Sequence, residues 1–133
     1  MRVRVTKPGR GQSAVELALI LPLLLLLLLG AIDLSRAFGV WMALSNAARE
    51  GARYGCQDPY DPDHRIEVYV RREVEAEGLA PADVDVDVDR PSGYAGGNPI
   101  IVQTSYPMEL LTLLLFSGQP VMIRAKAEMM ILG

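Results

Sequence analysis

The sequence has few of the residue types that usually carry chemistry. Among its 133 residues there are one cysteine and one histidine, and only 6% are aromatic. Cys56 cannot form a disulfide within the chain, so it is either an idle thiol or a cross-link between two copies. The sequence shows no metal-ligand cluster, phosphate-binding loop or nucleophile–base set around His64 or elsewhere, which argues against an enzyme. We therefore expect no cofactor and no small-molecule substrate.

Charge is also missing from parts of the chain. Acidic residues are absent before Glu16, and no charge of either sign occurs from Leu17 to Ile32. A membrane-spanning helix needs about 20 mostly apolar residues, so this run predicts one. The positive-inside rule places the basic leader in the cytoplasm and the chain after the run outside. Because no basic patch is interleaved with aromatic residues, nucleic acid is not an expected partner.

Glu16 stands at the entrance of the apolar run, where a carboxylate is costly. An ordinary secretory signal would need an Ala-x-Ala site after the run, and the sequence has none there. An uncleaved signal anchor is compatible with the topology but gives no reason for the acid. A prepilin-type cut between Gly11 and Gln12 does give one, because Glu16 becomes the fifth residue of the mature chain. An ammonium group at the new terminus of a neighbouring subunit would then neutralise it and set the stagger between subunits.

Two segments resemble one family. They are Arg10-Gly11-Gln12-Ser13-Ala14-Val15-Glu16, followed by Leu-Ala-Leu-Ile-Leu-Pro22, and the alanine-rich segment from Asn46 to Gly55. Together they resemble the TadE-like pseudopilins of tight-adherence (Flp-type) pilus systems. The resemblance implies cleavage by a prepilin peptidase and a role in assembling a type IV pilus at the bacterial inner membrane. It also implies other pilins or pseudopilins and the pilus assembly platform as partners.

Small residues recur at every fourth position along the same predicted helix, and we call this set the small-residue stripe: Ala31, Ser35, Gly39, Ala43, Ala47, Gly51 and Gly55. Such a stripe lets another backbone approach closely. Glycine weakens a helix by about 1 kcal/mol relative to alanine, so three glycines on one stripe indicate contact. The partner is either another pilin helix or the exported part of this chain.

The exported part, residues 57–133, predicts a small α+β head. A helix is expected from Asp63, as its N-cap, to Gly78. Strands are expected over 83–89, 100–106 and 121–132, the first from its strict valine–aspartate alternation. Residues 107–116 are too short to span a membrane and predict either a short helix covering the sheet or an apolar lip touching membrane or partner.

The predicted organisation is thus a leader (1–11), a long N-terminal helix that spans the membrane in its first half (12–56), and an α+β head (57–133). Two functions remain open. One is a pseudopilin or minor pilin, which either enters the filament or primes it. The other is an uncleaved, signal-anchored module whose head binds a cation or partner through four aspartates, Asp83, Asp85, Asp87 and Asp89. The charged row is also what keeps an edge strand soluble, which is the simpler interpretation.

Overall fold

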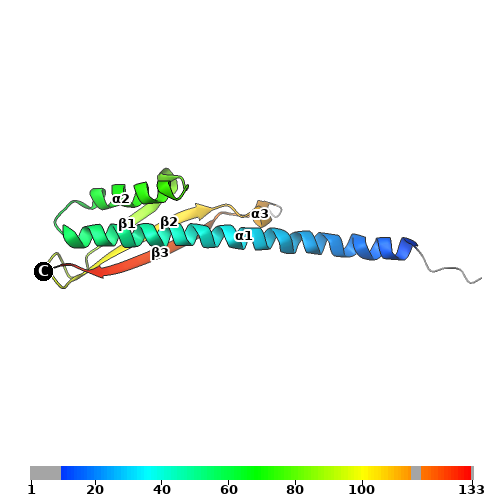
Figure 1. Cartoon of the computed structure of the whole chain (residues 1–133), viewed down its shortest axis with the longest axis horizontal. Coiled ribbons are helices and arrows are strands. Elements are labelled where there is room, and N and C mark those ends of the chain that lie inside the picture. The colour runs from blue at the N-terminus through cyan, green and yellow to red at the C-terminus, as the bar shows by residue number, and fades with distance from the viewer. Residues whose placement is uncertain (1–9, 115–117, 133) are drawn as a thin grey trace, which may run out of the picture.

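One continuous helix forms the long axis of the molecule. The structure, a computed structural model, describes residues 10–114 and 118–132, so most of the basic leader lies outside the described residues. Helix α1 (Arg10–Gln57) has 48 residues and continues through Pro22. At 1.5 Å per residue it is about 72 Å long. Its first half projects away from the rest of the chain, and its second half lies along the head (Figure 1).

The described part of the head contains a three-stranded antiparallel sheet in the order β1-β2-β3. The strands are β1 (Asp85–Asp89), β2 (Pro99–Met108) and β3 (Val121–Met130). Helix α2 (Asp63–Ala76), a 3-10 turn η1 (Pro81–Asp83) and a short helix α3 (Leu111–Leu114) complete it. Helix α1 contacts α2, β2 and β3, and α2 contacts β1. The predicted α+β class, with a long apolar helix and a small head, is confirmed.

Helix α2 follows from its apolar spacing. Ile66, Val70 and Val74 recur at four-residue intervals and are all buried. The helix ends at Ala76 with Glu77 as its C-cap, two residues before the predicted end. Gly78 follows the C-cap with a φ of 82°, a conformation that glycine adopts readily. The expected N-cap was wrong by one position, because Pro62 occupies it and Asp63 is the first helical residue.

The strands match the expected pattern with shifted ends. In β1 the aspartates are exposed and Val86 is buried, as the alternation predicted. Asp83 belongs to η1 instead, because Pro81 begins a 3-10 turn there. Strand β2 takes in Pro107 and Met108, which had been assigned to the short helix, because the hairpin with β3 continues until Met108 pairs with Val121.

The core lies between the second half of α1, α2 and the inner face of the sheet. Its fully buried apolar side chains come from all of these elements: Leu44, Ile66, Val70, Val74, Val84, Ile100 and Val102. Thr104 is buried among them, and its hydroxyl donates a hydrogen bond to the Leu44 carbonyl at 3.2 Å. The head is therefore packed directly onto the helix that carries the apolar run, and the two form one body in Figure 1.

Candidate functional site

The predicted cleavage segment lies at the free end of α1. Gly11, Gln12 and Glu16 are all exposed. The Gln12 side-chain amide donates a hydrogen bond to Glu16 Oε1 at 3.3 Å, so the two residues share one face of the helix, one turn apart. The structure places this group far from the head along α1 (Figure 1). The peptide bond between Gly11 and Gln12 and the Glu16 carboxylate are thus both accessible.

The second half of the small-residue stripe packs against the chain's own head. Ala43, Ala47, Gly51 and Gly55 are buried. A Cβ added at Gly51 would lie 2.5 Å from Val70 Cγ2, and one added at Gly55 would overlap the Ile100 side chain. These two glycines are therefore required for the close approach of α2 and β2 to α1.

The first half of the stripe has a different environment. Ala31, Ser35 and Gly39 are exposed. A Cβ built on Gly39 meets no described atom within 4 Å. The stripe is thus divided: its second half is used within the molecule, and its first half offers a smooth surface along α1.

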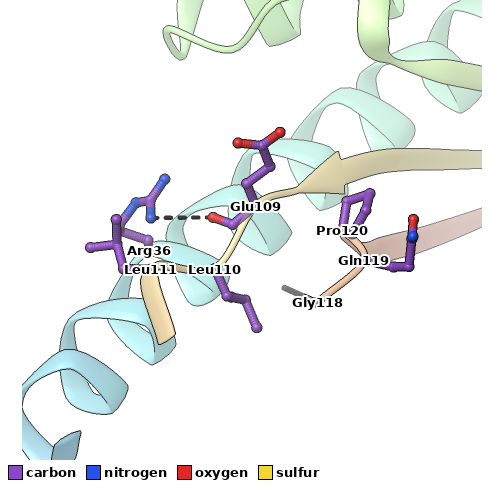
Figure 2. Close-up of a pocket in the computed structure, with 7 residues that line it drawn as sticks. All are labelled: Arg36, Glu109, Leu110, Leu111, Gly118, Gln119 and Pro120. Atoms are coloured by element: carbon purple, nitrogen blue, oxygen red, sulfur yellow. Dashed lines mark hydrogen bonds between the residues drawn. The ribbon is translucent and has the colours of Figure 1, made fainter. Parts of the chain in front are cut away.

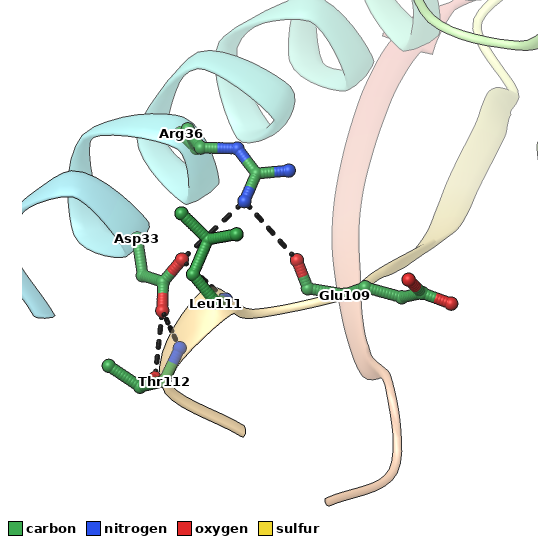
Figure 3. A network of polar contacts seen from close by, with 5 residues as sticks. All are labelled: Asp33, Arg36, Glu109, Leu111 and Thr112. Carbon is green, nitrogen blue, oxygen red and sulfur yellow. Dashed lines mark hydrogen bonds and ion pairs between the residues drawn. The ribbon is translucent and has the colours of Figure 1, made fainter. Parts of the chain in front are cut away.

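Asp33 holds the end of the head against α1, which the sequence did not reveal. The i,i+3 spacing of Asp33 and Arg36 by itself predicts a solvated or interfacial pair, but Asp33 is 4% exposed. Its carboxylate accepts hydrogen bonds from the backbone N–H groups of Leu111 and Thr112, both at 2.8 Å, and from the Thr112 hydroxyl at 2.7 Å (Figure 3). The carboxylate therefore caps the first turn of α3, where backbone donors have no partner within the helix.

Arg36 extends this network toward the solvent. Its guanidinium lies 3.5 Å from Asp33 Oδ1 and donates to the Glu109 carbonyl at 3.4 Å (Figure 3). Beyond Glu109 a pocket of about 240 Å³ opens between Arg36 and residues 118–120 (Figure 2). The sequence carried a weak signal of this arrangement: an acid directly after an uncharged run, and one threonine within the apolar segment around Leu111.

The aspartate row is shorter than predicted. Asp85, Asp87 and Asp89 lie on the exposed face of edge strand β1, opposite Ser105, Gln103 and Ile101 of β2. In the part of the chain that the structure describes, no group of three or more His, Cys, Asp or Glu side chains is arranged to hold a metal ion.

The loop after α1 is fixed by side chains of the helix end. The Tyr54 hydroxyl donates a hydrogen bond to Asp61 Oδ2 at 2.6 Å, and its ring stacks on Tyr69 with centroids 4.2 Å apart. The hydrogen bond to Asp61, with burial, raises the pKa of Tyr54. Cys56 is buried beside this loop, and burial raises the pKa of its thiol. The burial of Cys56 and the raised pKa of its thiol both favour an idle thiol over a cross-link between copies.

The fold and the exposed apolar half of α1 define a class of protein. In α1, a window of eighteen residues has a mean hydropathy of 2.7 and none of it is buried, which makes α1 long and apolar enough to cross a membrane. A single apolar helix near the N-terminus that carries a small α+β head fits a single-pass inner-membrane protein.

Comparison with known families supports a more specific assignment. Residues 11–53 match the family model described as TadE-like protein. The matched region begins at the predicted cleavage glycine and ends in the alanine-rich segment, so the resemblance predicted from the sequence is confirmed. A TadE-like region implies a Tad pilus-associated pseudopilin role. Searches of curated proteins and of solved structures found no match for this chain.

Proposed function

We propose that this chain is a pseudopilin or minor pilin that a prepilin peptidase cleaves between Gly11 and Gln12, and that acts in assembly of a tight-adherence type IV pilus. The observation that carries the proposal is the exposed group of Gly11, Gln12 and Glu16 at the free end of an apolar helix. The TadE-like match, which begins at Gly11, supports it. In this proposal the protein is not an enzyme, and it acts through contacts with other pilins or pseudopilins and the assembly platform.

Cleavage changes the electrostatics of the helix end. Before it, the leader contributes basic residues; after it, the ammonium group of Gln12 is the first charge of the mature helix. A positive charge at a helix N-terminus is unfavourable, and a nearby carboxylate offsets it. A carboxylate at the entrance of the apolar helix is costly, though less so than at the helix centre, where insertion scales give about 2.5–3.5 kcal/mol. In a bundle of staggered helices, the Glu16 carboxylate of one subunit and the ammonium group of its neighbour neutralise each other's charge.

The division of the small-residue stripe fits this role. Gly51 and Gly55 let α2 and β2 pack closely on α1, so that a movement of the membrane helix carries the head with it. The exposed residues Ala31, Ser35 and Gly39 remain for a neighbouring helix, which can approach closely because they have little or no side chain. We infer an orientation with the N-terminus in the cytoplasm and the head outside.

The rival proposal is an uncleaved, anchored binding module. The exposed row of Asp85, Asp87 and Asp89 is the observation in its favour. A row of like charges at an edge strand also protects that edge from pairing with other chains, so it does not require a ligand.

A complementation experiment separates the two. The gene is deleted from the bacterium that encodes it, and assembled pili are counted after one protein is re-expressed. The proteins are the wild type, Gly11→Ile, and a triple variant with Asn in place of Asp85, Asp87 and Asp89. Gly11→Ile places a branched side chain directly before the scissile bond. The proposal predicts that the wild type and the triple variant restore pili and that Gly11→Ile does not. Restoration by Gly11→Ile would contradict the proposal, as would normal piliation in the deletion strain.

A further inference from the structure

The place where α1 leaves its apolar run has exposed apolar side chains on the head as well as on the helix. Large apolar side chains of both α1 and the head are exposed there: Ile32, Leu34, Phe38, Leu111 and Val121. Large apolar side chains left exposed at one level of a molecule, on two different elements, indicate an interaction site. We call the set formed by Leu34, Leu111 and Val121 the junction surface.

Asp33 fixes the head part of this surface at one level along α1. The uncharged run ends at Ile32, and the next residue binds the backbone of Leu111 and Thr112. Because the Asp33 carboxylate satisfies these N–H groups, the start of α3 does not need water as a hydrogen-bond partner. Short irregular segments are excluded from an apolar medium because their backbone donors are unsatisfied there. The start of α3 has satisfied donors, so it can lie at the edge of the membrane's hydrocarbon core.

A mainly apolar cleft joins Leu34 of α1 to Val121 of the head, and Leu111 lies beside it in the wall of the pocket next to Arg36. The cleft has a volume of about 280 Å³ and lies between α1, α3 and the start of β3. Its lining includes Gly30, within the uncharged run, and Ile123, within the sheet. Asp33 and Thr112 also line it, and they are hydrogen-bonded to each other. Leu34 also lines it and is 73% exposed. The cleft is thus continuous with the surface of α1 that the membrane surrounds.

The depth of the junction surface matches that of a membrane boundary. Eighteen residues separate Glu16 from Leu34, which corresponds to about 27 Å of helix at 1.5 Å per residue. The hydrocarbon core of a bilayer is about 30 Å thick. With Glu16 at the inner boundary, Leu34 and the start of α3 are therefore at the outer one. Phe38 and Trp41, whose rings lie 5.9 Å apart, come next along α1, where aromatic residues anchor helices in the interface.

We propose that the junction surface binds lipid of the outer leaflet of the inner membrane, with an acyl chain entering the cleft between Gly30 and Ile123. The head then sits on the membrane instead of standing clear of it. A second copy of the chain is the rival occupant, but the exposed small residues that suit a neighbouring helix, Ala31, Ser35 and Gly39, do not line the cleft. The lipid contact does not depend on cleavage at Gly11, so its test is separate from that of the pilin role.

The test uses the full chain with Cys56→Ala, reconstituted in phosphatidylcholine–phosphatidylglycerol vesicles. One cysteine is introduced at Leu111 and, in a second protein, at Val121, which belongs to a different element, and each is labelled with an environment-sensitive nitrobenzoxadiazole dye. The matched control is Val68→Cys on α2, an exposed apolar position of the head away from the cleft. Circular dichroism checks that each variant is folded.

The proposal predicts that the dyes at residues 111 and 121 emit at shorter wavelength than the dye at residue 68. It also predicts loss of their fluorescence with lipids that carry a quencher near the headgroup, while the control is unaffected. Emission like that of the control at both positions would overturn the proposal. A second result would also overturn the proposal: a blue shift that lipid quenchers do not affect and that disappears when the protein is diluted into more vesicles. The occupant of the cleft would then be a second copy of the chain.

Discussion

Asp33 and Thr112 are joined by two hydrogen bonds to one oxygen: the Thr112 N–H at 2.8 Å and the Thr112 hydroxyl at 2.7 Å both donate to Asp33 Oδ2. The two residues are distant in sequence, and their pairing closes the membrane-proximal end of the head onto α1. At the other end, Gly51 and Gly55 let α2 and β2 reach the helix. The head is thus fixed to α1 at two levels, which explains how a small domain can follow the movements of a membrane helix.

Asp33→Asn should loosen this end of the head. Asparagine keeps the volume but replaces one accepting oxygen with an NH₂ group, which would face the Thr112 donors. We expect faster hydrogen exchange at the amides of Leu111 and Thr112, measured in detergent micelles, with little change at the amides of β2. Glu50→Gln is the control, because it removes a charge from a half-exposed position whose ion pair with Arg53 lies within α1. Unchanged exchange in the Asp33 variant would mean that the carboxylate does not hold α3.

Gly51→Ala and Gly39→Ala should change stability in opposite directions. Alanine is favoured over glycine by about 1 kcal/mol in a helix. At Gly39 no described atom lies within 4 Å of the added Cβ, so the variant should gain up to that amount. At Gly51 the Cβ would lie 2.5 Å from Val70 Cγ2, a stiff β-branched side chain. Overpacking costs about 1–3 kcal/mol, which exceeds the propensity gain. Chemical denaturation of both variants measures this, and equal stabilisation by the two would contradict the packing described.

Gly39→Leu tests the exposed half of the stripe in assembly. Gly39 is exposed and a Cβ added there meets no described atom within 4 Å, so the thermal midpoint of the purified protein should not fall. A neighbouring helix could no longer approach closely, and pilus assembly should decrease. Ala76→Leu, at an exposed position of α2, places the same side chain outside α1 and serves as the comparison. Equal piliation in the wild type and Gly39→Leu would show that no helix packs there.

Glu16→Ala should separate processing from assembly. The side chain is exposed and makes no contact with the described part of the head, so insertion and cleavage should proceed as in the wild type. Without the carboxylate, the ammonium group of a neighbour loses its partner in the membrane, and few pili should form. Glu75→Ala, at an exposed position on α2, controls for the loss of one acid. Normal pilus numbers with Glu16→Ala would refute the role assigned to this residue.

The sequence predicted those features that depend on local spacing. The four-residue interval of Ile66, Val70 and Val74 gave α2, and the alternation around Val86 gave β1. The position of Pro62, which displaced Asp63 from the N-cap, was a local error of one residue. Features that depend on distant contacts were not accessible. Asp33 looked like one half of an i,i+3 pair because its partners Leu111 and Thr112 are far along the chain.

The same limit applies to the small-residue stripe. Its spacing indicated close packing but could not say against what, because the choice depends on where the head folds back. The structure divides it between Gly51 and Gly55, which face the head, and Gly39, which does not. Strand β2 was likewise extended through Pro107 and Met108 by pairing with β3, a contact that the local composition did not contain.

The intact mass and N-terminal sequence of the native protein, extracted from membranes of cells with an active prepilin peptidase, test the central claim most directly. The account predicts a mature chain that begins at Gln12, and a longer chain that retains the leader when the peptidase is inactivated. A chain that still carries residues 1–11 in cells with active peptidase would contradict it, because Glu16 would then have no new terminus to neutralise it.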